Sequence, residues 1–428
     1  MNVLMLIENC SYPRDVRVRR EAETLFRAGM RVSVICPALK GQSRQEIVNG
    51  VRVYRYAAPR EGRGKVAYLW EYGYSMLAAL CLAIRIATTE GIDVIHAANP
   101  PDVFVFIAML FKPFGVKYVY DQHDLVPEMY RARYSGARKS MVARVLSFCE
   151  RCSYRHADHV VVANSSYREI AMLRGNVPSK RITIVRNGPD AAQLGSRAEA
   201  LAGLCEPGTT LIAYLGLMGV QDGVVHLIRA LNHLVCDLGR KDVRCLLLGS
   251  GEEEQNLARL TRALGLEPYV RFMGFVPDPE YLPYLLAADI CVDPDPSSEY
   301  NDRSTMIKIM DYMTASKPIV AFDLAETRRS AGKAALYVEP NDELEFAKAL
   351  AYLMEHPEQR AEMGAIGRSR VERDLSWSIS AECLLRAYGA LAPVSKGIPE
   401  RKAMSSAGLA SPSMTAPGNE IKLKKVRQ

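Results

Sequence analysis

Ionisable side chains cluster where one apolar stretch of the sequence ends, in "VYDQHDLVPEMY" (119–130). Asp121, His123, Asp124 and Glu128 all lie at the predicted junction of a strand with the loop that follows it. A histidine beside carboxylates can exchange protons near neutral pH, and sites of parallel-sheet proteins form at the carboxyl ends of strands. We therefore predict that His123 and Asp124 are catalytic, with a purely structural histidine as the alternative.

The stretch "YNDRSTMIKIMDYMTASKPIVAFD" (300–323) predicts a helix over residues 304–315, followed by a buried strand. Either Ser304 or Thr305 is suited to cap the helix at its start. Apolar residues recur at helical spacing and can face a core: Met306, Ile309, Met310 and Met313.

Two cations lie at the start of this helix, Arg303 and Lys308, where the helix dipole favours negative charge. They are reasonable there if a strong anion, such as a diphosphate, completes the site. We predict that Arg303, Ser304 and Lys308 bind a diphosphate and that Asp311, one turn further on, accepts hydrogen bonds from ribose hydroxyls. The alternative is a solvated arginine and a surface pair of Lys308 with Asp311.

A glycine loop in "YLGLMGVQDGVVHLIRAL" (214–231) joins a predicted buried strand to a helix. The strand ends at Gly216, and Gly219 and Gly223 precede the helix, which begins near Val224. Glycines let backbone N–H groups approach an anion at a helix N-terminus, so we predict that these three glycines bind the same diphosphate. A strand-to-helix turn that needs glycine for its own geometry is the alternative.

Three other motifs do not indicate a cofactor or a metal. The stretch "LLLGSGEEEQNLARL" (246–260) lacks the third glycine of a dinucleotide fingerprint, and its acidic residues would repel a pyrophosphate, so it predicts a capped helix start. "DPDP" (293–296) is typical of a rigid loop after a strand. Cys149 and Cys152 form a CxxC without a second pair, and a zinc site needs more ligands. We expect no bound metal.

Short runs rich in Val, Ile and Leu alternate with helical patterns along the chain. Continuous apolar strands separated by helices are typical of parallel sheets that are covered on both faces. Two such series predict an α/β protein with two doubly wound, Rossmann-like domains that face each other across a cleft. The predicted strands are 3–8, 31–37, 51–56, 93–98, 118–123, 159–164, 182–187, 210–216, 245–251, 270–276, 290–296, 319–323 and 335–340.

The strand and helix pattern weakens near 188–208, which we predict to be a linker. It would join an N-terminal domain, 1–190, to a C-terminal domain, 205–376. Residues 393–428 are rich in Ser, Pro, Ala, Gly and Lys, so we expect a disordered basic tail there.

The formal net charge of +7 is unevenly distributed over the 428 residues. Segment 131–155 has seven Lys and Arg against one Glu, in the pattern of a basic amphipathic helix. This pattern predicts contact with an anionic membrane surface, with a solvated helix face as the alternative. No zinc-finger, RNP or basic-zipper pattern accompanies the charge, so we do not expect a nucleic-acid partner.

The cysteines and the N-terminus predict the compartment. Ten scattered cysteines are typical of reduced thiols in the cytosol. The opening "MNVLMLIENCSYPRD" predicts a first strand rather than a signal peptide. No apolar run reaches the ~18 uncharged residues expected of a membrane span. We therefore expect a cytoplasmic protein that is peripheral on the inner face of the cell membrane.

The order of these motifs along residues 1–391 resembles glycosyltransferase family 4, whose members are retaining enzymes with the two-domain GT-B fold. The likeness is greatest to the bacterial branch that builds surface polysaccharides. The stretches that carry it are "SYPRDVRVRREAETLFRAGMRVSVICP", "DVIHAANPPD", "YDQHDLVPE", "VVVANSS", "VRNGPD", "YLGLMGVQDGV", "LLLGSGEEE", "FMGFVPDPE" and "STMIKIMDYMTASKPIVAFD".

The resemblance implies a role for each matching position. His123 would lie beside the transferred sugar, and the glycine loop would hold the donor phosphates. Asp311 would bond the donor ribose as a shorter substitute for the usual glutamate. The backbone of Gly274, Phe275 and Val276 would hold the nucleobase. The last helix, 377–391, would cross back onto the N-terminal domain.

Two features of the sequence, which involve three positions, depart from the family pattern. Leu217 and Asp222 stand where many relatives have an arginine and a lysine in the glycine loop, and Arg303 stands where many have a glutamate. We infer that the missing cations have moved to Arg303 and Lys308, which would keep the positive charge that faces the diphosphate. Asp302 and Glu299 are the candidates to replace the missing glutamate.

The resemblance implies transfer of a hexosyl unit, with retention, from a nucleoside-diphosphate sugar (a UDP- or GDP-sugar). The acceptor would be a polyprenyl-linked lipid or a glycan, and the leaving diphosphate can be stabilised by fixed cations and backbone amides without a metal. Two alternatives remain: a nucleotide-sugar epimerase of the same fold, and a non-catalytic nucleotide-sugar-binding partner.

Overall fold

The computed structural model describes residues 1–58, 65–133, 140–190, 201, 203–204, 206–277 and 280–391. The described part belongs to one compact unit, Met1–Ala392, which is separate from Pro393–Gln428. The predicted tail 393–428 and much of the predicted linker 188–208 lie outside the described residues.

An eight-stranded sheet forms the first domain, in the order β3-β4-β2-β1-β5-β6-β7-β8. Seven of its strands were predicted from their apolar runs, and each neighbouring pair of these seven is parallel. The strands are β1 (Asn2–Leu6), β2 (Arg31–Ala38), β3 (Gln45–Val48), β4 (Val51–Ala57), β5 (Val94–Ala98), β6 (Lys117–Gln122), β7 (His159–Val162) and β8 (Ile182–Ile184).

The strand that the sequence analysis missed is β3, which pairs antiparallel with β4 at the edge of this sheet. Asn49 and Gly50 make the turn between them with φ of 51° and 86°. An Asn-Gly pair with two positive φ angles is the usual two-residue hairpin turn. The signal was present in the sequence, but β3 is short and exposed and lacks the apolar run by which the other strands were recognised.

A six-stranded parallel sheet forms the second domain, in the order β11-β10-β9-β12-β13-β14. All six strands were predicted, and the prediction of two doubly wound sheets is confirmed. The strands are β9 (Thr210–Leu215), β10 (Val243–Leu248), β11 (Val270–Gly274), β12 (Ile290–Asp293), β13 (Ile319–Phe322) and β14 (Ala335–Val338).

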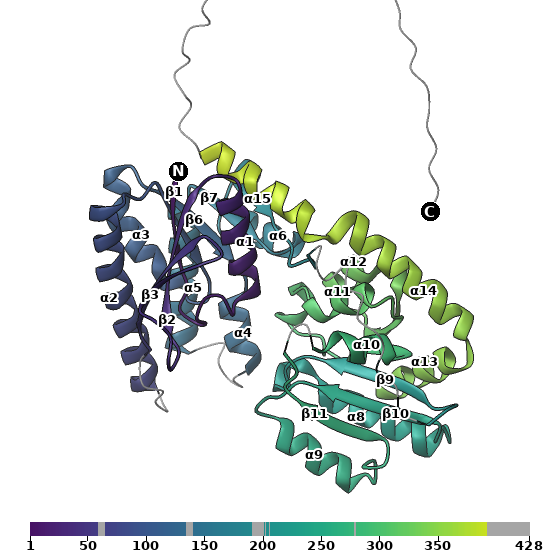
Figure 1. Cartoon of the computed structure of the whole chain (residues 1–428). Helices are drawn as coiled ribbons and strands as arrows, with labels where there is room; N and C mark the ends of the chain where they lie inside the picture. The colour runs from purple at the N-terminus through teal and green to yellow at the C-terminus, as the bar shows by residue number, and fades with distance from the viewer. Residues whose placement is uncertain are drawn as a thin grey trace, which may run out of the picture. The chain divides into compact units, whose positions relative to one another are not determined.

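Helices cover both faces of each sheet (Figure 1). Those of the first domain are α1 (Val16–Arg27), α2 (Lys65–Thr89), α3 (Val105–Phe111), α4 (Val126–Arg133), α5 (Met141–His156) and α6 (Ser165–Leu173). Those that follow are α8 (Val224–Asn232), α9 (Glu254–Ala263), α10 (Leu282–Ala287), α11 (Ile307–Thr314), α12 (Ala325–Ala331), α13 (Glu343–Glu355), α14 (Pro357–Arg370) and α15 (Trp377–Leu391).

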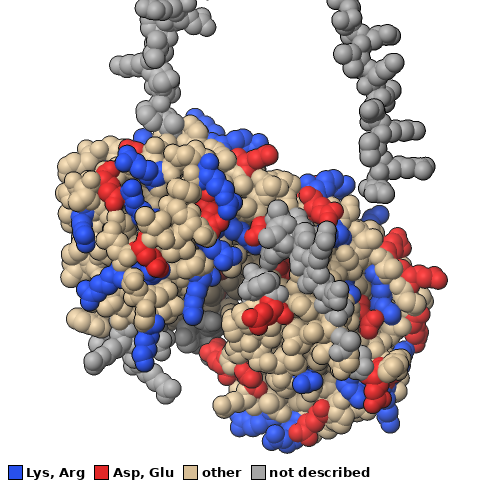
Figure 2. All heavy atoms as spheres, viewed as in Figure 1, with Lys and Arg blue, Asp and Glu red and all other residues tan. Residues whose placement is uncertain are grey.

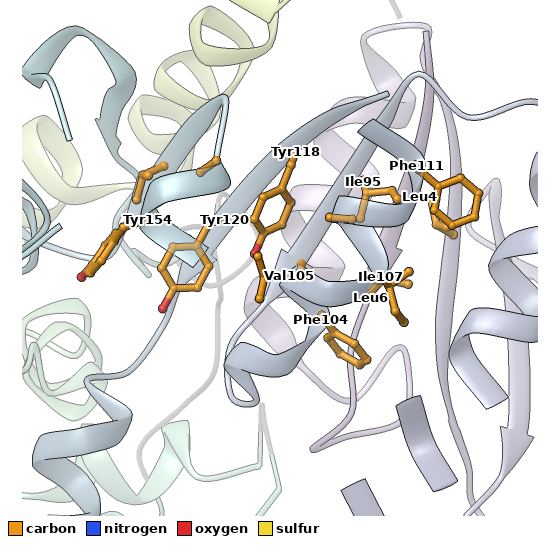
Figure 3. Close-up of a cluster of buried hydrophobic side chains, with 14 of the residues drawn as sticks. Leu4, Leu6, Ile95, Phe104, Val105, Ile107, Phe111, Tyr118, Tyr120 and Tyr154 are labelled. Carbon is orange, nitrogen blue, oxygen red and sulfur yellow. The ribbon is translucent and has the colours of Figure 1, made fainter. Parts of the chain in front are cut away.

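The core of the first domain has two layers. Helices α2, α3 and α5 pack on one face of the eight-stranded sheet, and Figure 3 shows side chains of this layer, among them Phe104, Tyr118 and Tyr120. Helices α1 and α15 pack on the other face. The layers bury the apolar runs that defined the strands, which accounts for the success of the strand predictions.

Helix α15 returns to the first domain, as the resemblance implied, and its bounds match the predicted 377–391. The indole Nε1 of Trp377 donates to Thr24 Oγ1 at 3.0 Å, and Ser380 Oγ accepts from the Arg186 backbone N–H at 3.1 Å. Tyr388 Oη lies 2.7 Å from His96 Nδ1 on β5. The chain that leaves the second domain therefore ends among buried side chains of the first.

One described helix has the length and composition of a membrane span, contrary to the expectation that no segment would. This is the Trp70–Thr89 part of α2, with a mean hydropathy of 1.2. Its longest uncharged run, the 13 residues between Glu71 and Arg85, is shorter than the ~18 uncharged residues expected of a membrane span. In the structure Ala79, Ala83 and Ile86 of this helix pack into the core of the first domain.

The nine cysteines that the structure describes are all free. Cys149 is buried and Cys152 is half-buried on α5, so the CxxC pair lies at ordinary positions of a helix.

Candidate functional site

The predicted catalytic histidine lies just beyond the end of β6 and is held by a buried carboxylate. The Nε2 atom of His123 lies 2.5 Å from Asp121 Oδ2, and 12% of the His123 side chain is exposed. Burial opposes a charge on His123, but the Asp121 carboxylate outweighs this effect and raises the pKa of His123 above its usual value. Because Asp121 occupies Nε2, the ring presents Nδ1 to a ligand.

Asn99, just after β5, fixes the backbone of the loop that carries His123. Its Oδ1 accepts from the N–H of His123 at 2.6 Å and from the N–H of Asp124 at 3.0 Å. Its Nδ2 donates to the Asp124 carbonyl at 2.8 Å and to Asp102 Oδ1 at 3.0 Å. One amide side chain therefore satisfies three backbone groups of the predicted catalytic pair, which a loop without regular structure could not satisfy by itself.

Asp121 belongs to a buried charge network made by Arg17, Glu21, His96, Asp121 and His123. The Arg17 guanidinium lies 2.7 Å from Asp121 Oδ1 and 3.2 Å from Glu21 Oε1. The His96 Nε2 atom lies 3.3 Å from both Glu21 Oε2 and Asp121 Oδ2. Burial opposes the charge of Asp121, but Arg17 and the imidazoles outweigh it and hold its pKa well below the usual range.

The sequence analysis did not identify Arg17, Glu21, His96 or Asn99. A signal for the first two was present, because charged residues four apart on α1 alternate with Val18, Ala22 and Leu25 on the same buried face. Charged residues on such a face must find buried partners. His96 stands inside an apolar strand and gives no comparable pattern.

The other two carboxylates of the "YDQHDLVPE" stretch have different surroundings. Asp124 Oδ1 accepts from Tyr300 Oη at 2.8 Å, which ties the His123 loop to a segment of the second domain. Glu128 is buried and pairs with Arg131 and Arg174 at 2.8 and 2.5 Å, so it holds helices together. The structure thus keeps Asp124 beside the candidate site and gives Glu128 a structural role.

The Lys308 ammonium, which we predicted to bind a diphosphate, is already paired with carboxylates in the structure. Lys308 is buried, and its Nζ lies 3.0 Å from Asp293 Oδ1 and 2.5 Å from Asp295 Oδ1. Burial opposes its charge, but the two carboxylates outweigh this effect and raise the pKa of Lys308. The alternative surface pair of Lys308 with Asp311 is wrong, and "DPDP" is more than a rigid loop because it supplies the two buried counter-charges.

The structure does bring Lys308 to the glycine loop. A Cβ atom on Gly216 would lie 3.7 Å from Lys308 Cε, and the ammonium lies 5.0 Å from the centre of the Tyr214 ring. Gly223 caps α8 with φ +62°, and a Cβ there would lie 2.1 Å from the Pro294 carbonyl oxygen. Glycine is therefore required at 223 both by the positive φ of the turn and by the close packing against "DPDP".

The amide of Gly219 already has a partner in the structure. Its N–H donates to Asp222 Oδ2 at 2.9 Å, in a short 3-10 turn that precedes α8. Asp222 stands where many relatives of the resembled family have a cation, so its carboxylate adds a negative charge beside Asp293 and Asp295. The charge around the glycine loop is therefore not the positive surface that the sequence analysis expected.

Arg303 and Ser304 lie before helix α11 rather than at its cap. The helix begins at Ile307 after Met306, which has no capping side chain, so the predicted caps Ser304 and Thr305 are wrong. The hydroxyl of Ser304 is buried and bonds the Tyr300 carbonyl and Tyr167 Oη at 2.8 and 3.0 Å. Arg303 is exposed and donates to the Glu299 carbonyl at 3.2 Å.

The predicted ribose and nucleobase residues lie at the ends of neighbouring elements. Asp311 on α11 is half-buried and accepts from Tyr281 Oη at 3.1 Å. Gly274 ends β11, and its carbonyl accepts from the Gly249 N–H at 2.8 Å. Phe275 is 74% exposed and Val276 is half-buried.

Gly249 joins the predicted nucleobase segment to the glycine loop, a link that the sequence analysis missed. Its φ is +142°, and a Cβ there would lie 1.8 Å from the Gly216 carbonyl oxygen. The N–H groups of Gly216 and Met218 in turn donate to Leu248 and Ser250 at 3.0 Å. The loops after β9, β10 and β11 therefore touch backbone to backbone.

Comparisons with known proteins agree with this architecture. The model of the family described as "Glycosyl transferase 4-like domain" matches residues 15–188, and that of "Glycosyl transferases group 1" matches residues 209–356.

Two curated relatives show moderate identity. The chain is 26% identical to a D-inositol 3-phosphate glycosyltransferase of Corynebacterium kroppenstedtii over 64% of this chain and 62% of the relative. It is 32% identical to a phosphatidyl-myo-inositol mannosyltransferase of Mycobacterium leprae over 35% of this chain and 39% of the relative. The matches thus span less than two thirds of these relatives' lengths.

Solved structures resemble the chain in fold at low sequence identity. A sucrose-phosphate synthase from Thermosynechococcus elongatus has a TM-score of 0.74 and 19% identity, over 91% of this chain and 99% of that one. HepE of Anabaena in complex with UDP-glucose has a TM-score of 0.65 and 16% identity, over 91% and 100%.

The two matched domains, the two parallel sheets and the returning helix α15 together show the family: the chain belongs to glycosyltransferase family 4, a family of transferase enzymes with the GT-B fold.

Proposed function

We propose that this protein is a retaining glycosyltransferase that moves a hexosyl unit from a nucleoside-diphosphate sugar to an acceptor hydroxyl. The observation that supports it most strongly is a contact between two segments that were predicted to carry site residues. One is the His123 loop of the first domain, and the other is the segment before α11 in the second domain. Tyr300 Oη donates to Asp124 Oδ1 at 2.8 Å, and Tyr167 Oη lies 3.0 Å from Ser304 Oγ. The His123 loop and the segment that leads to Lys308 therefore lie side by side.

For the donor we propose a UDP- or GDP-sugar whose diphosphate lies over the glycine loop. Its binding would rest on backbone amides and on the exposed Arg303, because the Lys308 ammonium is already engaged by Asp293 and Asp295. Burial and the neighbouring Asp293 raise the pKa of Asp295 well above its usual value, so this carboxyl group can hold a proton beside Lys308. Asp311 would bond the ribose, and the backbone of residues 274–276 would hold the base. The UDP-glucose bound by HepE supports a donor of this class.

We propose that the reaction needs no metal and that the diphosphate acts as the base. The bond between the anomeric carbon and the phosphate oxygen breaks, the acceptor oxygen bonds that carbon, and its proton passes to the leaving phosphate. His123 would contact the transferred sugar through Nδ1. The Lys308 ammonium engages Asp293 and Asp295, so these two carboxylates are not free to hold a divalent cation.

Nucleotide binding tests this proposal directly. We expect UDP or GDP to increase the free energy of unfolding by RT ln(1 + [L]/Kd), about 2.7 kcal/mol at a hundredfold excess over Kd, and so to raise the melting temperature. Thermal-shift measurements with UDP, GDP, their sugars and NAD decide the donor class. Stabilisation by NAD alone, or by none of these ligands, would contradict the proposal. Arg303→Ala should weaken the effect, and Arg373→Ala, an exposed arginine on another segment, should leave it unchanged.

Two other functions are compatible with donor binding. A nucleotide-sugar epimerase would convert the donor without an acceptor, so product analysis in the absence of acceptor identifies it. A non-catalytic partner would bind the donor but would not depend on His123. The geometry around His123 favours the transferase, since a buried carboxylate orients the ring and its loop is fixed by Asn99.

The acceptor, we propose, is a polyprenyl-linked lipid or a glycan in surface polysaccharide synthesis, reached at the inner face of the membrane. Helix α5 carries an exposed apolar stripe made by Met141, Val145 and Phe148, of which Phe148 is 58% exposed. Arg144 and Arg151 are exposed beside it. Apolar residues flanked by arginines on one helix are typical of contact with an anionic membrane surface.

The neighbouring helices extend this apolar surface. Helix α3, which contacts α5, exposes Phe106, Met109 and Leu110. Helix α2, in the same layer, exposes Trp70, Leu77 and Ile84 at heptad spacing. Figure 2 shows basic and acidic side chains interspersed on the face that it draws. We therefore assign the membrane contact to the layer of α2, α3 and α5.

Flotation with liposomes tests this assignment. We expect the protein to float with vesicles that contain phosphatidylglycerol and to float less with pure phosphatidylcholine. Val145→Glu with Phe148→Glu should reduce binding at least tenfold, because two apolar contacts are lost and two like charges are added. Tyr352→Glu on α13, an exposed aromatic of the second domain, is the control. Equal flotation of all variants, or no lipid preference, would refute the assignment.

A further inference from the structure

His96 lies at the centre of the buried charge network and has no role in the proposed function so far. It stands on β5 and is completely buried. Its Nε2 faces the carboxylates of Glu21 and Asp121 at 3.3 Å, and its Nδ1 lies 2.7 Å from Tyr388 Oη. The ring thus touches the carboxylate that orients His123.

Charge balance in the network requires one proton, which can lie on an imidazole or on Glu21, whose pKa is raised by burial and by Asp121. Glu21 and Asp121 are both completely buried, and Arg17 is the one permanently charged cation that pairs with them in the described structure. With both histidines neutral and both carboxyl groups ionised, one buried negative charge would be left without a counter-charge, which is costly. A proton on His96, which lies between the two carboxylates, supplies the balance.

Tyr388 fits a protonated His96. Burial and the two nearby carboxylates raise the pKa of Tyr388 well above its usual value, so its hydroxyl stays protonated and can accept from an imidazolium N–H. The two rings stack with 15° between their planes and 6.1 Å between their centroids. Tyr388 lies on α15, so the last helix of the described chain holds His96 at Nδ1, whereas Asp121 lies near Nε2.

We propose that His96, protonated and held by Tyr388, is a positioning residue for His123. It shares the Asp121 carboxylate with His123 and so fixes the orientation and the proton affinity of the catalytic ring. Tyr388 makes this arrangement depend on the docking of α15 onto the first domain. The proposal rests on the proposed function in treating His123 as the group that meets the substrate.

The groups that face His96 come from three elements: Arg17 and Glu21 from α1, Asp121 from β6 and Tyr388 from α15. Burial opposes its charge, but the hydrogen bonds and charges of Asp121 and Glu21 raise its pKa to about 9. A group with a raised pKa keeps its proton through neutral pH and loses it above this value. The arrangement should therefore hold at neutral pH and weaken above about pH 9.

Histidine NMR tests the proposal without any assay of activity. With histidine-labelled full-length protein, and His123 assigned from His123→Gln, we expect His96→Gln to raise the pKa of His123 by about 0.5 or more. The reason is that removal of the His96 cation leaves the Asp121 carboxylate shared between Arg17 and His123 only. Tyr388→Phe, which keeps the ring packing, should shift it in the same direction by less. An unchanged or lowered pKa of His123 in both variants would overturn the proposal.

Kinetics supply a second readout. We expect kcat to fall about 10- to 100-fold in His96→Gln and severalfold in Tyr388→Phe, with donor KM within about twofold. His159→Gln and Tyr12→Phe are matched controls, because His159 is buried on β7 outside the network and Tyr12 Oη is buried without a hydrogen-bond partner. Controls that lose as much activity as the two variants would show a general packing effect and contradict the proposal.

The two readouts separate this proposal from the proposed function. An inactive wild-type protein whose His123 pKa still responds to His96→Gln would contradict the function and support the positioning. Active wild-type protein whose His123 pKa is unchanged by His96→Gln would support the function and contradict the positioning. Glu21, His96 and Asp121 also place one donor atom each within 4.8 Å of the others. One equivalent of tightly bound metal, lost in His96→Gln, would therefore overturn the proposal.

Discussion

Replacement of His123 with alanine is expected to lower the rate of glycosyl transfer by a factor of about 10²–10⁴ while donor affinity changes little. The imidazole contacts the transferred sugar in the proposed arrangement, whereas the diphosphate and the base are held by the second domain. Steady-state kinetics with a nucleotide sugar and an acceptor, together with calorimetric titration of the nucleoside diphosphate, measure the two effects separately. The effect should appear in kcat more than in donor KM.

Two further variants define how His123 acts. Asp121→Asn keeps the shape of the carboxylate but removes its charge, so it should lower kcat strongly, because the ring loses the partner that raises its pKa. His356→Ala, at an exposed histidine between α13 and α14, is the control and should be neutral. Transfer by His123→Ala at the wild-type rate would exclude a catalytic role for His123.

Replacement of Lys308 with methionine is expected to destabilise the protein by about 3–5 kcal/mol. The substitution leaves the completely buried carboxylates of Asp293 and Asp295 without their shared ammonium. For a domain of 150–250 residues this corresponds to a fall in melting temperature on the order of 10 °C. Differential scanning calorimetry of wild-type and variant protein measures it.

The loss should be partly reversed by neutralising the partners. Lys308→Met combined with Asp293→Asn and Asp295→Asn removes the unpaired charges, so the triple variant should melt above the single one. Lys348→Met on α13 removes an exposed lysine paired with Glu345 at the surface and should leave the melting temperature nearly unchanged. A Lys308→Met protein as stable as the wild type would mean that the buried ion pairs do not hold this loop.

Much of the fold could be predicted because buried parallel strands are continuous apolar runs. All thirteen predicted strands occur, with ends shifted by a few residues, and the missed one is the exposed edge strand β3. The last helix was placed correctly by resemblance to the family. Helix α11 begins three residues later than expected, because the Ser304 hydroxyl bonds the Tyr300 carbonyl and Tyr167 Oη and does not cap the helix.

The candidate site was predicted in its location but not in its charges. His123 and Asp124 lie together, and Gly216 lies beside Lys308, because strand ends and loops follow from the sheet topology. Partners far apart in sequence could not be inferred from spacing: Arg17 meets Asp121 104 residues away, and Lys308 meets Asp293. Neighbours that the sheet topology dictates could therefore be predicted, whereas the ion-pair partners of Lys308 could not.

The central claim is that this protein transfers sugar from a nucleotide to an acceptor, and release of nucleoside diphosphate with and without acceptor tests it most directly. Membranes from a polysaccharide-producing bacterium supply the acceptor, and the donor is the nucleotide sugar that most raises the melting temperature. We predict release that depends on acceptor, matches the sugar incorporated mole for mole, and is lost in His123→Ala. Release at the same rate without acceptor, or conversion of the donor to its epimer, would contradict the account.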